Sequence, residues 1–285
     1  MKFGVREICD VVLRAKSRQT IGNQVFDKDE PVIYFDTAKT STVEGAATTV
    51  YAQGGKGNSR LIAWEGERTV TFTMEDALIS PLGFAILSGA GLVEATAGKT
   101  INVHMTSQVA ATVAAGKVVV DLNAALPTNG DLAATDIYGF VLDSAGSIGH
   151  KLGKGTDKGD GTVEFTVESG VEGNVVILVD YYVAMASGVQ QLEVTPDKFA
   201  GSYYLEASTL FRRQEDGVDM PAQFIIPNVK IQSAFTFSMA ASGDPSTFTF
   251  TMDAFPDYTK FDKTKKVLFA LQIVEDFQSA DAVNL

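Results

Sequence analysis

The sequence predicts an all-β protein, mainly an antiparallel β-sandwich or barrel with one short helix, carrying an inserted immunoglobulin-like β-sandwich. Three observations support this prediction. Several segments alternate strictly between apolar and polar side chains, as half-buried strands do. The clearest are residues 68–74, 229–239 and 247–252. Turn-forming sequences recur between such segments, at 129–130, 160–161, 215–217 and 243–245. Helical periodicity is scarce.

Each strand follows from the same alternation. In residues 68–74, for example, Val70, Phe72 and Met74 alternate with three threonines, so one face of the strand is apolar. Trp64 also occupies an alternating strand and is expected to be buried. Further strands are predicted, in chain order, at 31–37, 47–53, 60–65, 99–106, 117–122, 137–143, 162–168, 175–183, 202–211, 222–226 and 267–274.

One short helix is predicted to begin after Ser80. Ser80 can cap the free amide groups, and Pro81 suits the first helical position because its φ angle is fixed. The helix is expected to end at Gly89 or Gly91 and to pack its apolar side chains on the sheet. A shorter turn is predicted at 195–197.

The middle of the chain differs in charge and composition from both flanks. Residues 94–196 carry 12 acidic and 5 basic side chains, whereas residues 1–93 carry 11 and 10 and residues 197–285 carry 12 and 8. The two flanks share the same threonine- and phenylalanine-rich strands. We therefore predict a host β domain formed by residues 1–93 and 195–285, with an immunoglobulin-like domain of residues 94–194 inserted between them.

Composition argues against several classes of protein. The net charge of −12 argues against a nucleic-acid reader, which needs clustered Lys and Arg. Cys9 is the only cysteine, so no internal disulfide forms, and its apolar neighbours predict a buried, inert thiol. The sequence shows neither a secretion signal nor a stretch apolar enough to cross a bilayer. These features predict a protein made in the cytoplasm, without a membrane partner.

No catalytic, cofactor-binding or metal-ligating set emerges, and we predict a non-enzymatic protein without cofactors. His104 is expected to be a structural residue within a strand, and His150 a surface residue in a glycine-rich loop. Residues 157–161 lack the ligand spacing of a calcium loop and are interpreted as a hairpin turn. The glycine-rich run 54–58 is interpreted as a flexible loop rather than a tight turn. It is not a phosphate loop, because no Gly-Lys-Ser/Thr follows and the neighbouring elements are strands.

Two blocks of sequence resemble the tail tube proteins of tailed bacteriophages. The first is YAQGGKGNSRLIAWEGERTVTFTMEDALISP, from Tyr51 to Pro81, and the second is QFIIPNVKIQSAFTFSMAASGDP, from Gln223 to Pro245. The resemblance implies a virion structural protein that assembles with itself into stacked, hexameric rings and contacts other tail proteins. The rings would form a conduit through which DNA passes without sequence-specific binding. The middle segment departs from the family, because the simplest tube proteins lack it.

Assembly of this kind needs segments that become ordered between subunits. The candidates are the loop residues Gly54, Gly55, Lys56, Gly57 and Asn58, together with a mobile N-terminal arm before Pro31. Two other functions stay open. The chain could be another virion component, such as a baseplate ring or capsid decoration protein, or a carbohydrate-binding β-sandwich.

Overall fold

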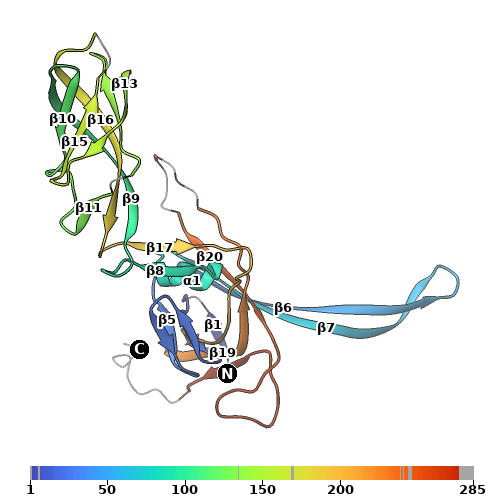
Figure 1. Ribbon diagram of the computed structural model, residues 1–285. Helices are drawn as coiled ribbons and strands as arrows, with labels where there is room; N and C mark the ends of the chain where they lie inside the picture. The colour runs from blue at the N-terminus through green and yellow to red at the C-terminus, as the bar shows by residue number, and fades with distance from the viewer. Residues whose placement is uncertain are drawn as a thin grey trace. The chain divides into compact units, whose positions relative to one another are not determined.

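The chain divides into two compact units, Met1–Leu92 with Leu192–Leu285, and Val93–Gln191. A computed structural model of the protein describes residues 2–5, 7–133, 135–167, 170–237, 239, 241–242 and 246–275 (Figure 1). Almost all regular structure in these residues is antiparallel strand, with one short helix, so the predicted all-β class is confirmed. That the two units are separate domains, with the inner one immunoglobulin-like, stays a prediction.

The first unit is built on a nine-stranded antiparallel sheet. Seven strands run in the order β5-β2-β18-β19-β20-β7-β6, while β1 pairs with β18 and β21 with β19. Their bounds are β1 Phe3–Val5, β2 Asp10–Ala15, β5 Pro31–Phe35, β6 Ala38–Gly54, β7 Ser59–Asp76, β18 Ser202–Arg213, β19 Asp219–Ile231, β20 Phe248–Ala254 and β21 Ala270–Ile273. A small hairpin of β3 (Gln19–Ile21) and β4 (Gln24–Phe26) lies outside the sheet.

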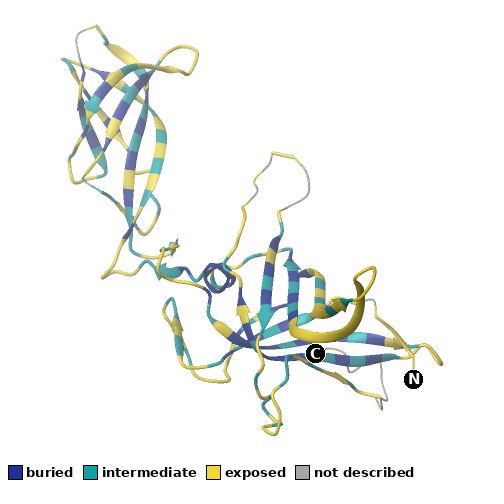
Figure 2. Ribbon diagram, turned by 90° about the vertical axis from the view of Figure 1, so that its right-hand side faces the viewer, coloured by how far each residue is buried: buried dark blue, intermediate teal, exposed yellow. Residues whose placement is uncertain are grey.

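Alternate side chains of these strands build one core. Val11 and Leu13 of β2, Phe72 of β7 and Phe250 of β20 are fully buried in it, and the banded colouring of Figure 2 shows the alternation. Because β2 is an interior strand of the sheet with alternate residues buried, the prediction of a mobile arm before Pro31 is wrong. The apolar alternation in residues 10–15 is the signal that could have identified this strand.

The single helix forms as predicted. Helix α1 (Pro81–Ser88) begins after Ser80, whose hydroxyl accepts a hydrogen bond of 2.9 Å from the Gly83 amide. It ends at Gly89, which adopts the left-handed conformation with φ 70°. Ile86 and Leu87 of α1 belong to the same buried cluster as the sheet residues, so the helix packs on the sheet.

The predicted strand at residues 229–239 is only partly formed, because β19 ends at Ile231. The aromatic side chains that follow β19 instead pack against other rings. The ring centre of Phe84 in α1 lies 4.9 Å from that of Phe235 and 5.1 Å from that of Phe237. The ring centres of Phe237 and Phe248 are 5.1 Å apart. Packing around α1 therefore replaces strand pairing in this segment. The predicted turn at 243–245 lies outside the described residues.

The second unit is a two-sheet structure with its own core. One sheet has the order β10-β15-β14, and the other has β11-β16-β12-β13, with β9 also paired to β16. The bounds are β9 Ile101–Val113, β10 Lys117–Asp121, β11 Gly130–Leu132, β12 Tyr138–Leu142, β13 Ile148–Lys154, β14 Thr156–Asp157, β15 Thr162–Thr166 and β16 Gly173–Met185. The short strands β8 (Gly91–Glu94) and β17 (Gln190–Glu193) pair where the chain enters and leaves this unit.

Candidate functional site

The outer part of the β6–β7 hairpin is the feature of the first unit that does not pack on its core. Near the sheet the hairpin is a normal part of the fold, because Val70, Phe72 and Met74 of β7 are buried and β7 pairs with β20. Beyond that point the two strands continue as a ribbon without further strands beside them (Figure 1). We call residues 44–69 the distal hairpin.

The distal hairpin is open to solvent on both faces. Every residue in it is exposed except Ala52 and Gly54, which are half-buried. The sequence predicts separate strands at 47–53, 60–65 and 68–74, but the structure joins the last two into the single 18-residue strand β7. A two-stranded ribbon alone is marginally stable in water, and the described part of the first unit supplies no layer that covers this one.

A β-bulge sets which side chains share a face of the distal hairpin. Between the pairs Ala47–Arg68 and Thr49–Glu65, β7 supplies one more residue than β6. The extra residue places Ile62 and Trp64 on the opposite face from Val70, although all three lie at even positions.

One face of the ribbon beyond the bulge is apolar. Trp64 pairs with Val50 and Ile62 with Ala52, so these four side chains form one patch, which we call the apolar patch. Val50 is 64% exposed, Ile62 55% and Trp64 54%. The prediction that Trp64 is buried is therefore wrong, because alternation defines a strand's two faces but not what covers them.

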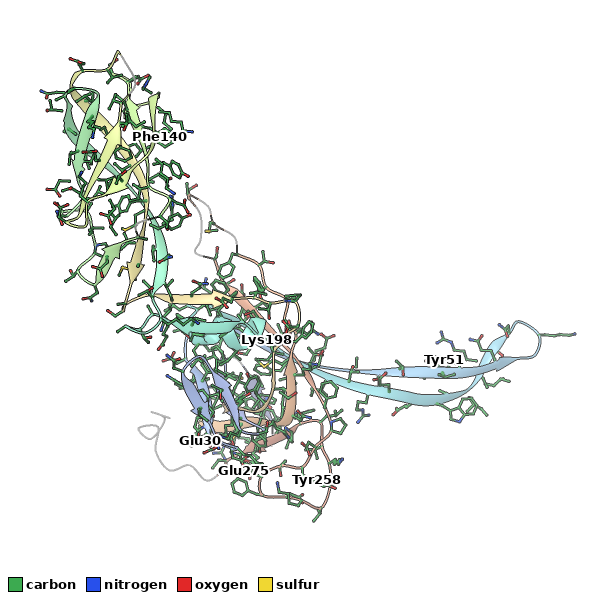
Figure 3. The ribbon with its side chains drawn as sticks, viewed as in Figure 1. Glu30, Tyr51, Phe140, Lys198, Tyr258 and Glu275 are labelled. Atoms are coloured by element: carbon green, nitrogen blue, oxygen red, sulfur yellow. The ribbon has the colours of Figure 1, made fainter. Side chains whose placement is uncertain are left out.

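The other face is more polar. The guanidinium of Arg60 lies 4.1 Å from the ring centre of Tyr51, a residue labelled in Figure 3. Arg68 and Glu65 form an ion pair of 3.9 Å next to the bulge. Both contacts are solvent-exposed and contribute little stability by themselves, so they favour solubility of this face.

The glycine-rich residues 54–58 close the hairpin as a hydrogen-bonded turn, and their flexibility stays a prediction. The Asn58 amide donates to the Gly55 carbonyl over 3.2 Å, and the Asn58 side chain donates to Gln53 Oε1 over 3.3 Å. Gly55, Gly57 and Asn58 have φ angles of 80°, 86° and 48°, which explains the residue types. Gly54 ends β6, and Lys56 lies at the tip.

The residues considered for chemistry are dispersed. Cys9 is buried as predicted, and burial raises the pKa of its thiol. His104 Nε2 lies 3.0 Å from Asp180 Oδ2 on the exposed face of β9 and β16. His150 is not in a loop as predicted but in β13, paired with Val141, because the nearby glycines accompany β-bulges between β12 and β13.

Within the described ranges, no three His, Cys, Asp or Glu side chains are grouped to hold a metal ion. Residues 157–161 connect β14 to β15 as a hairpin turn, as predicted. No helix in this part of the chain is long and apolar enough to span a membrane. The apolar patch on the distal hairpin is therefore the candidate site.

The model of the YomU/Tube protein family matches residues 20–268, which include the distal hairpin, α1 and the whole second unit. No curated protein matches the sequence.

Proposed function

The chain belongs to the YomU/Tube protein family, a phage tail tube family of structural proteins, and from this membership we propose that it forms stacked, hexameric rings that conduct DNA. Family membership makes it a self-assembling component of the virion tail that contacts other tail proteins. Six copies per ring and the passage of DNA are our proposal. The observation that supports assembly between copies is the exposed apolar patch on the distal hairpin.

The patch needs a protein surface to cover it. Val50, Ile62 and Trp64 lie together on a ribbon that makes no contact with a second layer of the described chain. Contiguous exposed apolar surface of this kind marks interaction sites. A neighbouring copy that packs on the patch would bury a tryptophan, the residue type that most often dominates binding energy at interfaces. We assign the turn residues Gly54, Gly55, Lys56, Gly57 and Asn58 to the same contact.

The charge of the chain suits a conduit for DNA. Residues 1–93 and 197–285, which make up nearly all of the first unit, together carry 23 acidic and 18 basic side chains, and this excess of negative charge disfavours phosphate binding. DNA would therefore slide past the assembled protein without being held. The second unit, Val93–Gln191, has two sheets around a separate core, and we propose that it is an inserted immunoglobulin-like domain.

Trp64 allows a direct test, because it is the only tryptophan in the chain. Negative-stain electron microscopy and tryptophan emission would be recorded over a concentration series. Rings or hollow tubes should appear, and Trp64 emission should move to shorter wavelength as assembly removes the indole from water. Particles that stay monomeric at high concentration would contradict the proposal and favour a baseplate ring or capsid decoration protein that needs a partner.

A variant of the apolar patch tests whether the distal hairpin is the contact surface, separately from whether the protein assembles. Val50→Ser with Ile62→Ser removes two apolar side chains and retains Trp64 as the reporter. Assembly should fall at least about tenfold, as it does when interface anchors are lost, while circular dichroism stays unchanged. Val119→Ser, which removes a 50% exposed valine from β10, is the matched control and should assemble normally. Normal tubes with an unshifted Trp64 emission would exclude the hairpin as the contact.

A further inference from the structure

The loop at residues 255–269, between β20 and β21, is basic although the protein is acidic. It carries Lys260, Lys263, Lys265 and Lys266 against Asp257 and Asp262. All four lysines are exposed or half-buried. At its tip Phe261 is 91% exposed, an unusual position for a phenylalanine on a monomer surface.

Hydrogen bonds hold this loop in a defined shape. Asp257 and Val267 exchange two backbone hydrogen bonds, of 3.2 and 2.9 Å, which close the base of the loop. Asp262 accepts hydrogen bonds from the amide and hydroxyl of Thr264. Lys16, which directly follows β2, contacts Asp257, and Lys260 Nζ lies 4.9 Å from the ring centre of Tyr204. Phe261 is thus presented on a fixed support; Figure 3 labels Tyr258 in the same loop.

A groove of about 590 Å³ lies elsewhere on the same unit. Its described lining includes the carboxylates Glu7 and Asp10 and the apolar side chains Ile8, Leu210, Pro221 and Val274, and it contains no Lys or Arg. A groove with apolar walls and an acidic rim is complementary to an aromatic side chain flanked by lysines. We call it the acidic groove.

The loop does not fill the groove of its own chain. It contacts β18 at Tyr204, whereas the groove is lined by β18 residues from Ser208 to Leu210. At a rise of about 3.3 Å per residue these points are roughly 13 to 20 Å apart along the strand. The 91% exposure of Phe261 confirms that the groove of the same copy does not hold it.

We infer that the Phe261 loop of one copy docks into the acidic groove of a second copy, with Phe261 between the apolar walls and the lysines beside Glu7 and Asp10. The inference rests on the proposed function, for which it supplies a lateral contact. The two surfaces differ and lie apart on one chain, so the contact is head-to-tail. Head-to-tail contacts close into rings when the rotation between copies permits.

Charge reversal tests the pairing. Lys263→Glu with Lys265→Glu should lower the ring fraction at fixed concentration by about tenfold or more, as should Glu7→Lys with Asp10→Lys. The chain that carries all four substitutions should recover assembly, because both partners are reversed together. Phe261→Ser should abolish assembly, whereas Val25→Ser, on the 51% exposed valine of β4, should not. Circular dichroism of each variant controls for folding.

The outcomes separate this inference from the proposed function. Loss of assembly in each double variant, together with recovery of assembly in the variant that carries all four substitutions, supports the loop–groove contact. Normal rings from Phe261→Ser and Lys263→Glu/Lys265→Glu overturn it while leaving the tube function standing. Loss without recovery also overturns it, since the loop then contacts another surface. A chain that ends at Glu275 should assemble normally. If this truncated chain is the only variant that fails to assemble, residues 276–285 bind in the groove and the inference is wrong. A wild type that forms no rings refutes the proposed function itself.

Discussion

At the scale of single residues, the buried phenol of Tyr203 makes stability depend on pH. Tyr203 in β18 is 2% exposed, and burial raises its pKa to about 12. An unfolded chain loses this proton near pH 10 (about the model-peptide value). The folded chain retains it, so the stabilisation is complete below about pH 10 and decreases as pH rises from about 10 to about 12.

We expect the free energy of unfolding to fall through this window by about 1 kcal/mol per pH unit on account of Tyr203. Tyr203→Phe should remove that part of the fall. Urea denaturation at a pH below 10 and at a pH above it measures the effect. Tyr138→Phe, which removes an exposed phenol from β12, serves as the matched control for the substitution itself. Equal pH dependence in wild type and Tyr203→Phe would contradict the argument.

At the scale of elements, the end of α1 depends on a glycine for two separable reasons. Gly89 has φ +70°, and a Cβ there would lie 2.3 Å from the Phe199 carbonyl carbon and 2.7 Å from the Ala200 nitrogen. Gly217, between β18 and β19, has the same φ of +70° but nothing within 4 Å of such a Cβ. Comparing Gly89 with Gly217 therefore separates the cost of the left-handed backbone from the cost of steric overlap.

Gly217→Ala should therefore cost only the left-handed conformation, about 1 kcal/mol. Gly89→Ala should cost that amount and a further 1 to 3 kcal/mol (roughly the range for overpacking), because backbone atoms must move. Thermal or urea denaturation of both variants measures the difference. Similar losses from the two substitutions would show that the Phe199 segment shifts freely and does not fix the end of the helix.

The sequence predicts correctly those elements whose ends depend on residues close together in the chain. Ser80, Pro81 and Gly89 sufficed for α1 because capping involves neighbours in the chain. Alternation located most strands for a similar reason. It failed at residues 232–237, where rings that pack on Phe84 replace strand pairing, and it could not show that the ribbon around Trp64 has no covering layer. Both outcomes depend on residues distant in sequence.

The candidate site was predictable only in part. The glycines of the run 54–58 indicate an assembly candidate, and the run lies at the tip of the distal hairpin. The apolar patch was missed, because Val50 and Trp64 become neighbours through the register of the two strands and the bulge on β7. Two strong strand segments on either side of a short glycine-rich run are the signal that could have indicated a long hairpin.

At the scale of the whole molecule, the two units have separate cores. The cluster that includes Phe72, Leu205 and Phe250 shares no residue with the cluster that includes Val120, Phe165 and Tyr181. Phe165 is central to the second cluster, and Gly139 and Gly155 leave the space that its ring occupies. Separate cores predict that the units unfold in separate transitions, as independently folded domains do.

Core truncations in each unit test this division. Phe72→Ala and Phe165→Ala each remove a fully buried ring and should each cost about 3 to 5 kcal/mol. In calorimetry of the unassembled protein, each substitution should lower one of two transitions and leave the other in place. Tyr138→Ala, at an exposed ring of the second unit, serves as the control and should shift neither transition strongly. If both core substitutions shift a single common transition, the units stabilise one another, and the second unit is an integral part of the subunit rather than an inserted domain.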